Sequence, residues 1–406
     1  MSAPLSIDYV KSLSGPQWLI DRRLTAANML DGVAWPTKKA EEWRYSPIDK
    51  FDLSVFAPVG SADSAVAPAL ITQAEVNVHL HNGALVSVDG AVDGLTVVRA
   101  VDSDTDVLGA LPADPFGLVN AALAVDPIVL KIEAGATVSS PILVSLTGSG
   151  EAQLSTPLLV VEAGADAQAT VVVSSESQAT DSVVIPRVYA SLANSARIRI
   201  ADLQILGPTV TCFGHTDVSV GAQATFSGWG AGIGGSWARQ RVDVQLNGRG
   251  SNVEYAAAYF GTEEQILDYR MFIDHVGADT TSNLLFNGVV DDKSMGIYTG
   301  MIRIAETGCG SNANQTNRTI TLSDDAAVES VPNLEILNND VHCSHASTVG
   351  PVDADQLFYL ETRGVPTDQA TKLVVGGFFD AVLDAAPAPG LADRAQLGID
   401  RKLGVA

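Results

Sequence analysis

The residue types best suited to metal chemistry gather in one short stretch, residues 338–350, which reads NNDVHCSHASTVG. It contains one of only three cysteines and two of only six histidines, as His342, Cys343 and His345. In an extended strand alternate side chains share a face, so Cys343 and His345 would lie together, about 7 Å apart. A thiolate and an imidazole placed in this way can bind a soft metal ion or an iron–sulfur intermediate. On these residues alone an inert role stays open, with a buried cysteine and capping or surface histidines.

The composition limits the class of protein and its partners. The 406 residues exceed one ordinary compact core, unless the chain is a solenoid that grows by adding turns. The formal net charge of −23 argues against nucleic acid or an anionic membrane as a partner, although a generally acidic surface also explains it. Three cysteines without a CxxC pair favour a reducing cytoplasm over a disulfide framework. The first 15 residues lack the pattern of a secretory signal, and no apolar stretch is long enough to span a membrane.

The middle of the chain predicts an all-β solenoid. Short runs rich in β-branched residues follow one another from about residue 71, and small-residue turns separate them. The turns recur at a nearly constant step of 27 to 30 residues, at Gly135, Gly164, Asn194, Gly221, Gly248, Gly277 and Thr307. We expect the corner glycine or asparagine to adopt the left-handed backbone conformation. A large β-sandwich is the competing fold, but its turns would be spaced less regularly.

Helical segments are predicted on both sides of this middle. Residues 17–30 have apolar side chains at helical spacing and stop at Asp31-Gly32, and Thr37 is expected to cap a short helix. Trp43 in that short helix suits either local packing or contact with another element. Residues 116–123 are a further helix candidate within the middle.

After residue 350 the pattern becomes helical again. One helix is expected to begin at Asp353 and to end near Gly364, and a second to begin at Pro366. A link over residues 386–392 and a short tail of mixed charge follow. The predicted domains are therefore an N-terminal helical domain (1–70), a β core (71–350) and a C-terminal helical domain (351–406).

The familiar motifs of hydrolases and nucleotide-binding proteins are absent from the sequence. No G-x-x-x-x-G-K-[ST], G-x-S-x-G or H-E-x-x-H pattern occurs. A β-helix that cleaves polysaccharides would need clustered carboxylates in a groove. The paired acids Asp291-Asp292 and Asp324-Asp325 look like turn residues instead. We therefore expect a non-catalytic protein, with a polysaccharide-active enzyme as an alternative.

Five segments together resemble one known family. They are EEWRYSPIDKF (41–51), YTGMIRI (298–304), NANQTNRTITLSDDA (312–326), CSHASTVG (343–350) and DQLFYLETRG (355–364). In this order they resemble the SufB/SufD family of iron–sulfur cluster assembly proteins, over essentially the whole chain. The CSHAS sequence, in place of a glutamate-rich histidine segment, favours the SufD branch. A departure is Ala346-Ser347-Thr348, where that branch often has Gly-Ala-Thr.

The resemblance implies a fold and a set of partners. It implies a right-handed parallel β-helix core between helical domains, a heterodimer with SufB through the β-helices, and the SufC ATPase bound to the C-terminal helices. It also implies a role in iron acquisition and in forming a nascent cluster. A homodimer of the isolated chain, and a SufB-like scaffold acting on its own, remain alternatives.

The resemblance also assigns roles to particular residues. It implies that His345 faces a SufB cysteine across the subunit junction, and that Cys343 is either a second ligand or a small core residue. The cofactor would be a transient iron–sulfur cluster or iron at this junction, with none bound permanently to the isolated chain, and the sequence leaves a flavin undecided. Cys212 and Cys309 are expected in the core, and His342 at the surface or on an edge strand. The residues expected to contact the ATPase are Leu357, Phe358, Tyr359, Leu360 and Arg363.

Overall fold

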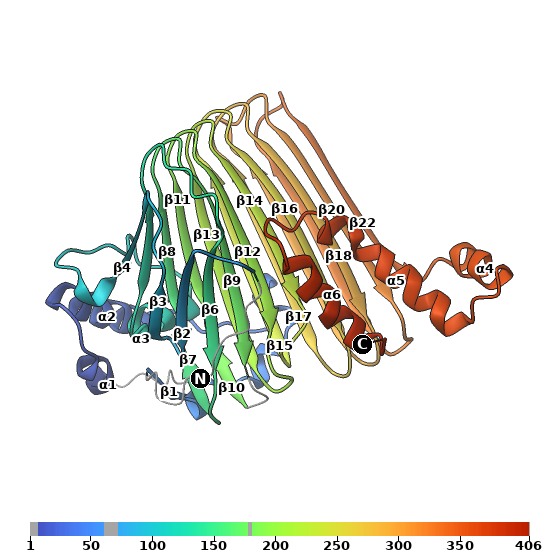
Figure 1. Cartoon of the computed structure of the whole chain (residues 1–406), viewed down its shortest axis with the longest axis horizontal. Helices are drawn as coiled ribbons and strands as arrows, with labels where there is room; N and C mark the ends of the chain where they lie inside the picture. The colour runs from blue at the N-terminus through green and yellow to red at the C-terminus, as the bar shows by residue number, and fades with distance from the viewer. Residues whose placement is uncertain (1–6, 61–71, 178–180, 406) are drawn as a thin grey trace.

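The computed structural model describes residues 7–60, 72–177 and 181–405 of the chain. Its middle is a stack of strands in which successive turns of chain add strands alternately to two facing sheets (Figure 1). This arrangement is a β-solenoid of about eight turns, with helices near both ends of the chain. The predicted mainly-β solenoid fold is confirmed.

One sheet has 12 strands, and its main path runs β21-β19-β17-β15-β13-β11-β8-β5-β4. Its strands are β1 (Ala57–Pro58), β4 (Leu95–Arg99), β5 (Ile128–Ile132), β7 (Gln153–Ser155), β8 (Leu158–Ala163), β10 (Ser182–Val184), β11 (Arg187–Leu192), β13 (Thr211–Val220), β15 (Trp237–Leu246), β17 (Ile266–His275), β19 (Met295–Ile304) and β21 (Ala327–Ile336). The other sheet has 10 strands in the order β22-β20-β18-β16-β14-β12-β9-β6-β2-β3. Its strands are β2 (Val76–His81), β3 (Ala84–Asp89), β6 (Ile142–Gly148), β9 (Gln168–Ser177), β12 (Arg197–Ile205), β14 (Thr225–Gly232), β16 (Asn252–Gly261), β18 (Thr281–Val290), β20 (Asn312–Thr321) and β22 (His342–Pro351).

The two ends of the solenoid differ. At the N-terminal end β3 and β4 pair antiparallel with β2 and β5, and so interrupt the parallel ladders. At the other end β21 and β22 pair in parallel on one side only, and each is the last strand of its sheet. The C-terminal end therefore presents two strand edges, which are open to further pairing.

The core lies inside the solenoid because inward-facing residues stack in register from turn to turn. Val218, Val244, Ile273 and Ile302 pair one with the next along the 12-stranded sheet, and all four are buried. Burying a side chain of this size contributes roughly 1.5–3 kcal/mol relative to leaving it exposed. The β-branched runs in the sequence thus become ladders that hold successive turns together.

The corners differ from the prediction. Of the seven predicted corner residues, only Gly135 adopts the left-handed conformation. At the other six corners the left-handed residue lies one to three positions after the predicted one. These residues are Asp166, Ser195, Gln223, Gly250, Asp279 and Gly310. The predicted Gly248 is instead required by close stacking, because a Cβ there would lie 2.0 Å from the backbone nitrogen of Ala222 in a neighbouring turn. The step length was correct, but the glycines mainly let adjacent corners approach.

The sequence of strand β14 (Thr225–Gly232), TFSGWGAG, is rich in glycine and carries only a weak strand signal. Inside the solenoid these glycines make room for tyrosine rings. A Cβ at Gly228 would lie 2.1 Å from the Tyr255 ring, and one at Gly232 would lie 2.0 Å from the Tyr269 hydroxyl.

The N-terminal segment packs on the outer face of the 12-stranded sheet. The predicted helix over 17–30 is α2 (Gln17–Leu30), the candidate over 116–123 is α3 (Pro115–Leu123), and α1 is Ile7–Ser12. The helix expected after Thr37 is only a 3-10 turn, η1 (Glu41–Trp43); the other 3-10 turns are η2 (Ile48–Lys50), η3 (Leu53–Val55) and η4 (Ala100–Asp102). Trp43 contacts another element, since its ring lies 6.4 Å from that of Trp237 on β15.

The C-terminal helices are α4 (Ala354–Thr362), α5 (Thr367–Leu383) and α6 (Leu391–Lys402). Gly364 follows α4 with a φ of +86°, as its expected capping role requires. The tail of mixed charge forms a helix, α6, which was not expected. Its apolar residues Leu391, Ala395 and Ile399 recur every four positions and are buried against the 10-stranded sheet. None of the helices in the described ranges is both long and apolar enough to cross a membrane.

The domain boundaries at residues 70 and 350 stay predictions. Part of the connector expected between the first two domains, and the beginning of the N-terminus, lie outside the described residues.

Candidate functional site at the open end of the solenoid

The stretch singled out in the sequence forms the last strand, β22, at the edge of the 10-stranded sheet (Figure 1). In its register with β20, Cys343 pairs with Ala313 and His345 pairs with Gln315. Ala313 and Gln315 are both buried. Paired residues of parallel strands point to the same side, so Cys343 and His345 face the interior of the solenoid. The expected shared face is thus present in the structure.

The two side chains nevertheless differ in exposure. Cys343 is half-buried and packs against the apolar core, and this burial raises the pKa of its thiol. His345 is exposed, because no further turn of the solenoid covers it. His342 is also exposed at the start of the strand, and its backbone N–H donates to the Ser311 carbonyl over 2.9 Å. The expectation that His342 lies at the surface is correct.

A layer of buried polar side chains lies one turn below. Gln315, Asn317 and Tyr298 are at most 1% exposed. Among the described residues, neither amide atom of Gln315 has a hydrogen-bond partner, and neither do the Asn317 Oδ1 and the Tyr298 hydroxyl. Buried polar atoms are nearly always paired, and an orphaned one costs about 1–3 kcal/mol.

One hydrogen-bonded chain joins this layer to the last turn. Asn317 Nδ2 donates to Ser330 Oγ over 2.8 Å, and Ser330 Oγ lies 2.7 Å from Ser347 Oγ on β22. In the sequence the run NANQTN (312–317) carries only a family likeness. The structure adds that Gln315 and Asn317 stand at inward positions of β20.

The other two cysteines lie apart from this site. Cys212 is buried inside the solenoid on β13, as expected, and burial raises its thiol pKa. The expectation that Cys309 lies in the core is wrong, because it is exposed. Cys309 falls in the turn between β19 and β20, where its carbonyl accepts a hydrogen bond from Asp279 in a neighbouring corner.

The residues expected to contact a partner ATPase lie on α4 and just after it. Figure 1 shows this helix projecting beyond the C-terminal end of the solenoid. No residue of α4 is buried, and the side chains of Phe358 and Tyr359 are 67% and 58% exposed. Arg363 lies over the Tyr359 ring, with its guanidinium carbon 5.2 Å from the ring centre. The helix therefore presents apolar and basic groups to solvent instead of covering the last turn.

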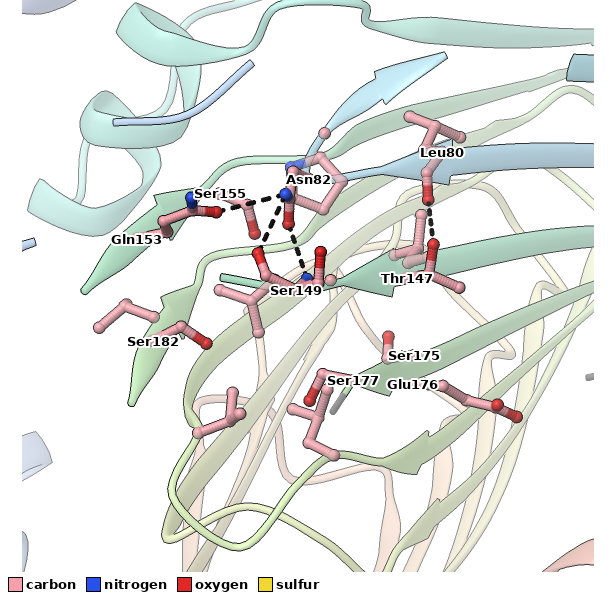
Figure 2. Close-up of a pocket in the computed structure, with 18 residues that line it drawn as sticks. Leu80, Asn82, Thr147, Ser149, Gln153, Ser155, Ser175, Glu176, Ser177 and Ser182 are labelled. Atoms are coloured by element: carbon pink, nitrogen blue, oxygen red, sulfur yellow. Dashed lines mark hydrogen bonds between the residues drawn. The ribbon is translucent and has the colours of Figure 1, made fainter. Parts of the chain in front are cut away.

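A pocket near the first turns of the solenoid is too small for a substrate (Figure 2). Its cavity is about 30 Å³, room for roughly two water molecules. Asn82 makes three hydrogen bonds to two neighbours there: its amide donates to the Ser149 carbonyl and to Gln153 Oε1, and its oxygen accepts from the Ser149 N–H. These side chains secure a corner of the fold.

The paired acids lie in turns, as expected. Asp292 adopts a φ of 53°, and its backbone N–H donates to Asp291 Oδ1 over 2.8 Å. Asp324 and Asp325 occupy the turn between β20 and β21.

Comparisons with known proteins agree on one family. The model of the SUF system FeS cluster assembly, SufBD core domain, matches residues 145–378. An iron–sulfur cluster assembly SufBD family protein of Mycobacterium tuberculosis is 28% identical over 303 residues, which cover 73% of this chain and 76% of that protein. The iron–sulfur cluster assembly protein SufD of Escherichia coli is 25% identical, over 91% of this chain and 89% of its own length. SufD of Bacillus subtilis is 33% identical over 160 residues, 39% of this chain and 37% of that protein.

Proposed function

The chain belongs to the SufBD family of SUF-system iron–sulfur cluster assembly proteins, on its SufD side, and from this premise we propose that it is a non-catalytic subunit. It pairs with SufB through the open end of its β-solenoid and contributes His345 to a nascent cluster at the junction. It carries the SufC ATPase on its C-terminal helices. Its involvement in assembling iron–sulfur clusters follows from the family; the partners and the residue roles are the proposal.

The observation that carries this proposal is the pair of free strand edges beside His345. β21 and β22 are each the last strand of a sheet, and the N–H and C=O groups on their outer edges pair with no further strand of the described chain. The N-terminal end differs, because antiparallel strands interrupt the ladders there. A second solenoid that docks edge to edge at β21 and β22 would extend both ladders and cover His345.

His345 and Cys343 form half of a ligand set. An iron–sulfur cluster takes about four thiolate or imidazole ligands, and these two residues provide at most two. His345 is exposed and can bind through a neutral imidazole nitrogen. Cys343 must lose a proton to become a ligand, and its raised thiol pKa makes this harder in the isolated chain. We therefore assign His345 the primary role and Cys343 a secondary one.

The orphaned polar atoms beneath the last strand support a function for this end. The Gln315 amide, Asn317 Oδ1 and the Tyr298 hydroxyl cost stability in the isolated chain, since they are buried without partners among the described residues. When a partner closes over β22, these atoms can bond to water or to a bound group that the junction then holds. Local instability of this kind is common where a site is completed only on assembly.

Two alternatives remain. A SufB-like scaffold would hold a cluster on the isolated chain, which a stable chromophore after anaerobic reconstitution with iron and sulfide would reveal. A homodimer through the same strand edges is the other arrangement that β21 and β22 permit. A cytoplasmic location also stays a prediction.

The test compares two histidines of the same strand. The His345→Ala and His342→Ala variants are coexpressed with SufB and SufC, and the purified complexes are assayed for cluster content and transfer. We expect H345A to assemble normally and to lose at least five-fold in cluster yield, while H342A keeps both. An H345A complex that matures clusters at the rate of the unmodified complex would remove His345 from the site.

A further inference from the structure

A large hollow lies on the outer face of the 12-stranded sheet, away from the open end. Its volume is about 740 Å³, and residues 107–114, which lead into α3, form one wall. The opposite wall is the outer face of β11, β13 and β15. Three strands of the sheet path, β15, β17 and β19, separate β13 from the last strand, β21. The cavity is therefore distinct from the junction proposed above.

Three potential metal ligands meet on the floor of this cavity. His215 and Asp217 are two positions apart on β13, so both point outward, and Asp243 of β15 is the register partner of Asp217. His215 Nε2 lies 2.8 Å from Asp243 Oδ2 and 3.2 Å from Asp217 Oδ1. One ligand atom from each of the three residues lies within 4.8 Å of the others. All three side chains are half-buried, which holds them in place and leaves a side open to the cavity.

The charge of the cavity favours a cation. Its lining includes the carboxylates of Asp114, Glu162, Asp217 and Asp243 and the guanidinium of Arg241. Arg187, buried beneath the floor, forms ion pairs with Asp114 and, at 3.5 Å, with Asp217, so four carboxylates face two guanidiniums. Arg241 Nε donates to both oxygens of Asp243, at 3.0 and 2.9 Å. Since an ionised carboxylate offers about four acceptor positions, Asp243 retains lone pairs for a further partner.

The surroundings of His215 also suit a metal ligand. Arg187, buried beneath it, donates to His215 Nδ1, so the Nε2 hydrogen points between the two carboxylates. A cation can occupy the position of this hydrogen when the proton moves to Nδ1. Asp114 Oδ2 is 3.9 Å from Nδ1 and contacts Arg187. A small approach, with Arg187 moving aside, would let it accept the second ring N–H, as carboxylates near metal-bound histidines commonly do.

A neighbouring ion-pair cluster shows what a purely structural arrangement looks like in this sheet. Asp268 is fully buried and accepts from Arg239 at 2.8 Å and from Arg270 at 2.9 Å. Two guanidiniums there neutralise one carboxylate, and no imidazole takes part in these ion pairs. The His215 cluster differs, because its three carboxylates outnumber the two guanidiniums of Arg187 and Arg241. It also contains an imidazole and adjoins a cavity.

We propose that His215, Asp217 and Asp243 bind a divalent transition-metal ion, of the class of Fe²⁺, Mn²⁺ or Zn²⁺, on the cavity side of the 12-stranded sheet. One imidazole with two carboxylates is a donor set that these ions accept. The remaining coordination positions open toward the cavity, where water or a small anionic ligand can bind. This site is independent of the function proposed above, and each can fail without the other.

The test uses the full chain, stripped with EDTA and carrying H345A and H342A, which removes the junction histidines. Co²⁺ is titrated by visible absorption and Mn²⁺ by electron paramagnetic resonance. We expect one site of defined affinity, weakened at least ten-fold by Asp217→Asn and by Asp243→Asn. The matched control is Asp274→Asn, an outward carboxylate of β17 paired with Arg303 at 3.0 Å, which should bind as the parent does.

A second measurement keeps the proposal testable where the asparagine variants fold poorly. In the parent chain with Mn²⁺ bound, pulsed paramagnetic resonance should show coupling to an imidazole nitrogen, and His215→Gln should abolish it. Circular dichroism establishes that each variant is folded. Two results would overturn the site: equal affinity in parent, D217N and D243N, or bound Mn²⁺ without nitrogen coupling. Either one would mean that the cluster is only an ion-pair network.

Discussion

His345 on β22 is the register partner of Gln315 on β20, so the exposed imidazole stands one strand beyond a buried amide without hydrogen bonds. Gln315 is 1% exposed, and neither its Oε1 nor its Nε2 has a partner among the described residues. The last complete turn of the solenoid, directly below the proposed ligand, therefore contains a buried amide whose hydrogen-bonding capacity is unused. Substitution of Gln315 therefore tests whether this unpaired amide lowers the free energy of unfolding.

We predict that Gln315→Leu leaves the isolated chain as stable as before or raises its free energy of unfolding by about 1–3 kcal/mol, because it removes an unpaired buried amide. Gln204 on β12 is the matched control, since it is also buried but bonded. Its Nε2 donates to the Gly234 carbonyl over 2.9 Å, and its Oε1 accepts from the N–H groups of Ile233 and Gly234.

Gln204→Leu should therefore cost about 2 kcal/mol or more, since it leaves the N–H and the carbonyl of Gly234 without the partner they have in the unmodified chain. Chemical denaturation of both variants beside the unmodified chain measures the contrast. Equal destabilisation by the two substitutions would show that the Gln315 amide is hydrogen-bonded. Its burial would then not lower the stability of the chain.

Much of the fold could be predicted from the sequence because stacked turns repeat the same physical requirement. Each turn must return after a fixed length of chain, so the corners recur at a near-constant step. The identity of the corner residue could not be predicted in the same way. Gly248 stands there because Ala222 of a neighbouring turn would collide with a side chain, and that contact exists only after stacking.

The site could be predicted in part. The spacing of Cys343 and His345 placed both on one face of a strand, since strand periodicity is local. The ligand-like cluster of His215, Asp217 and Asp243 could not be found in this way. Asp243 is 28 positions from His215 and reaches it only through the pairing of β13 with β15. The same applies to α6, whose short apolar stripe becomes visible only against the sheet that buries it.

We predict that the double substitution Phe358→Ala and Tyr359→Ala weakens binding of the SufC ATPase at least ten-fold. Both side chains are more than half exposed and α4 has no buried residue, so the isolated chain should change by less than about 0.5 kcal/mol. Isothermal titration measures the affinity and thermal unfolding the stability. Val55→Ala, which truncates an equally exposed apolar side chain on η3, should leave the affinity unchanged. If the double variant binds the ATPase normally, α4 is not the docking helix.

We predict that His275 makes the protein less stable in acid. Burial lowers its pKa to about 4, while its ring nitrogens bond to Thr280 and Ser282. The unfolded chain, with a value near 6.5, binds the proton first, so this contribution is complete above about pH 6.5 and is lost as the pH falls toward 4. The expected loss is on the order of 3 kcal/mol.

The measurement is urea unfolding of the chain and of His275→Gln between pH 7.5 and 4.5. His79 and His81 have pKa values lowered by burial and add to the same slope, so the difference between the two proteins isolates His275. Parallel curves for the two proteins would contradict the prediction.

We predict that Asp202 lowers the stability of the protein as the pH rises, whereas His275 lowers it as the pH falls. It lies on β12 inside the solenoid, where it lines a cavity of about 20 Å³ together with Cys212 and Tyr255, and burial raises its pKa to about 7. The unfolded carboxyl ionises near pH 4, so the folded state pays an increasing penalty as the pH rises from about 4 to 7, and the full penalty above that. Asp202→Asn removes this penalty.

The free energy of unfolding of D202N should therefore exceed that of the unmodified chain by a few kcal/mol at pH 8, on the order of 3–4, and should match it near pH 4. Asp166→Asn is the control, because Asp166 is exposed at a left-handed corner that asparagine tolerates equally well. It should differ from the unmodified chain by less than about 0.5 kcal/mol at either pH. A gain in D202N that is the same at pH 4 and pH 8 would point to better packing, because only relief of a buried charge grows with pH.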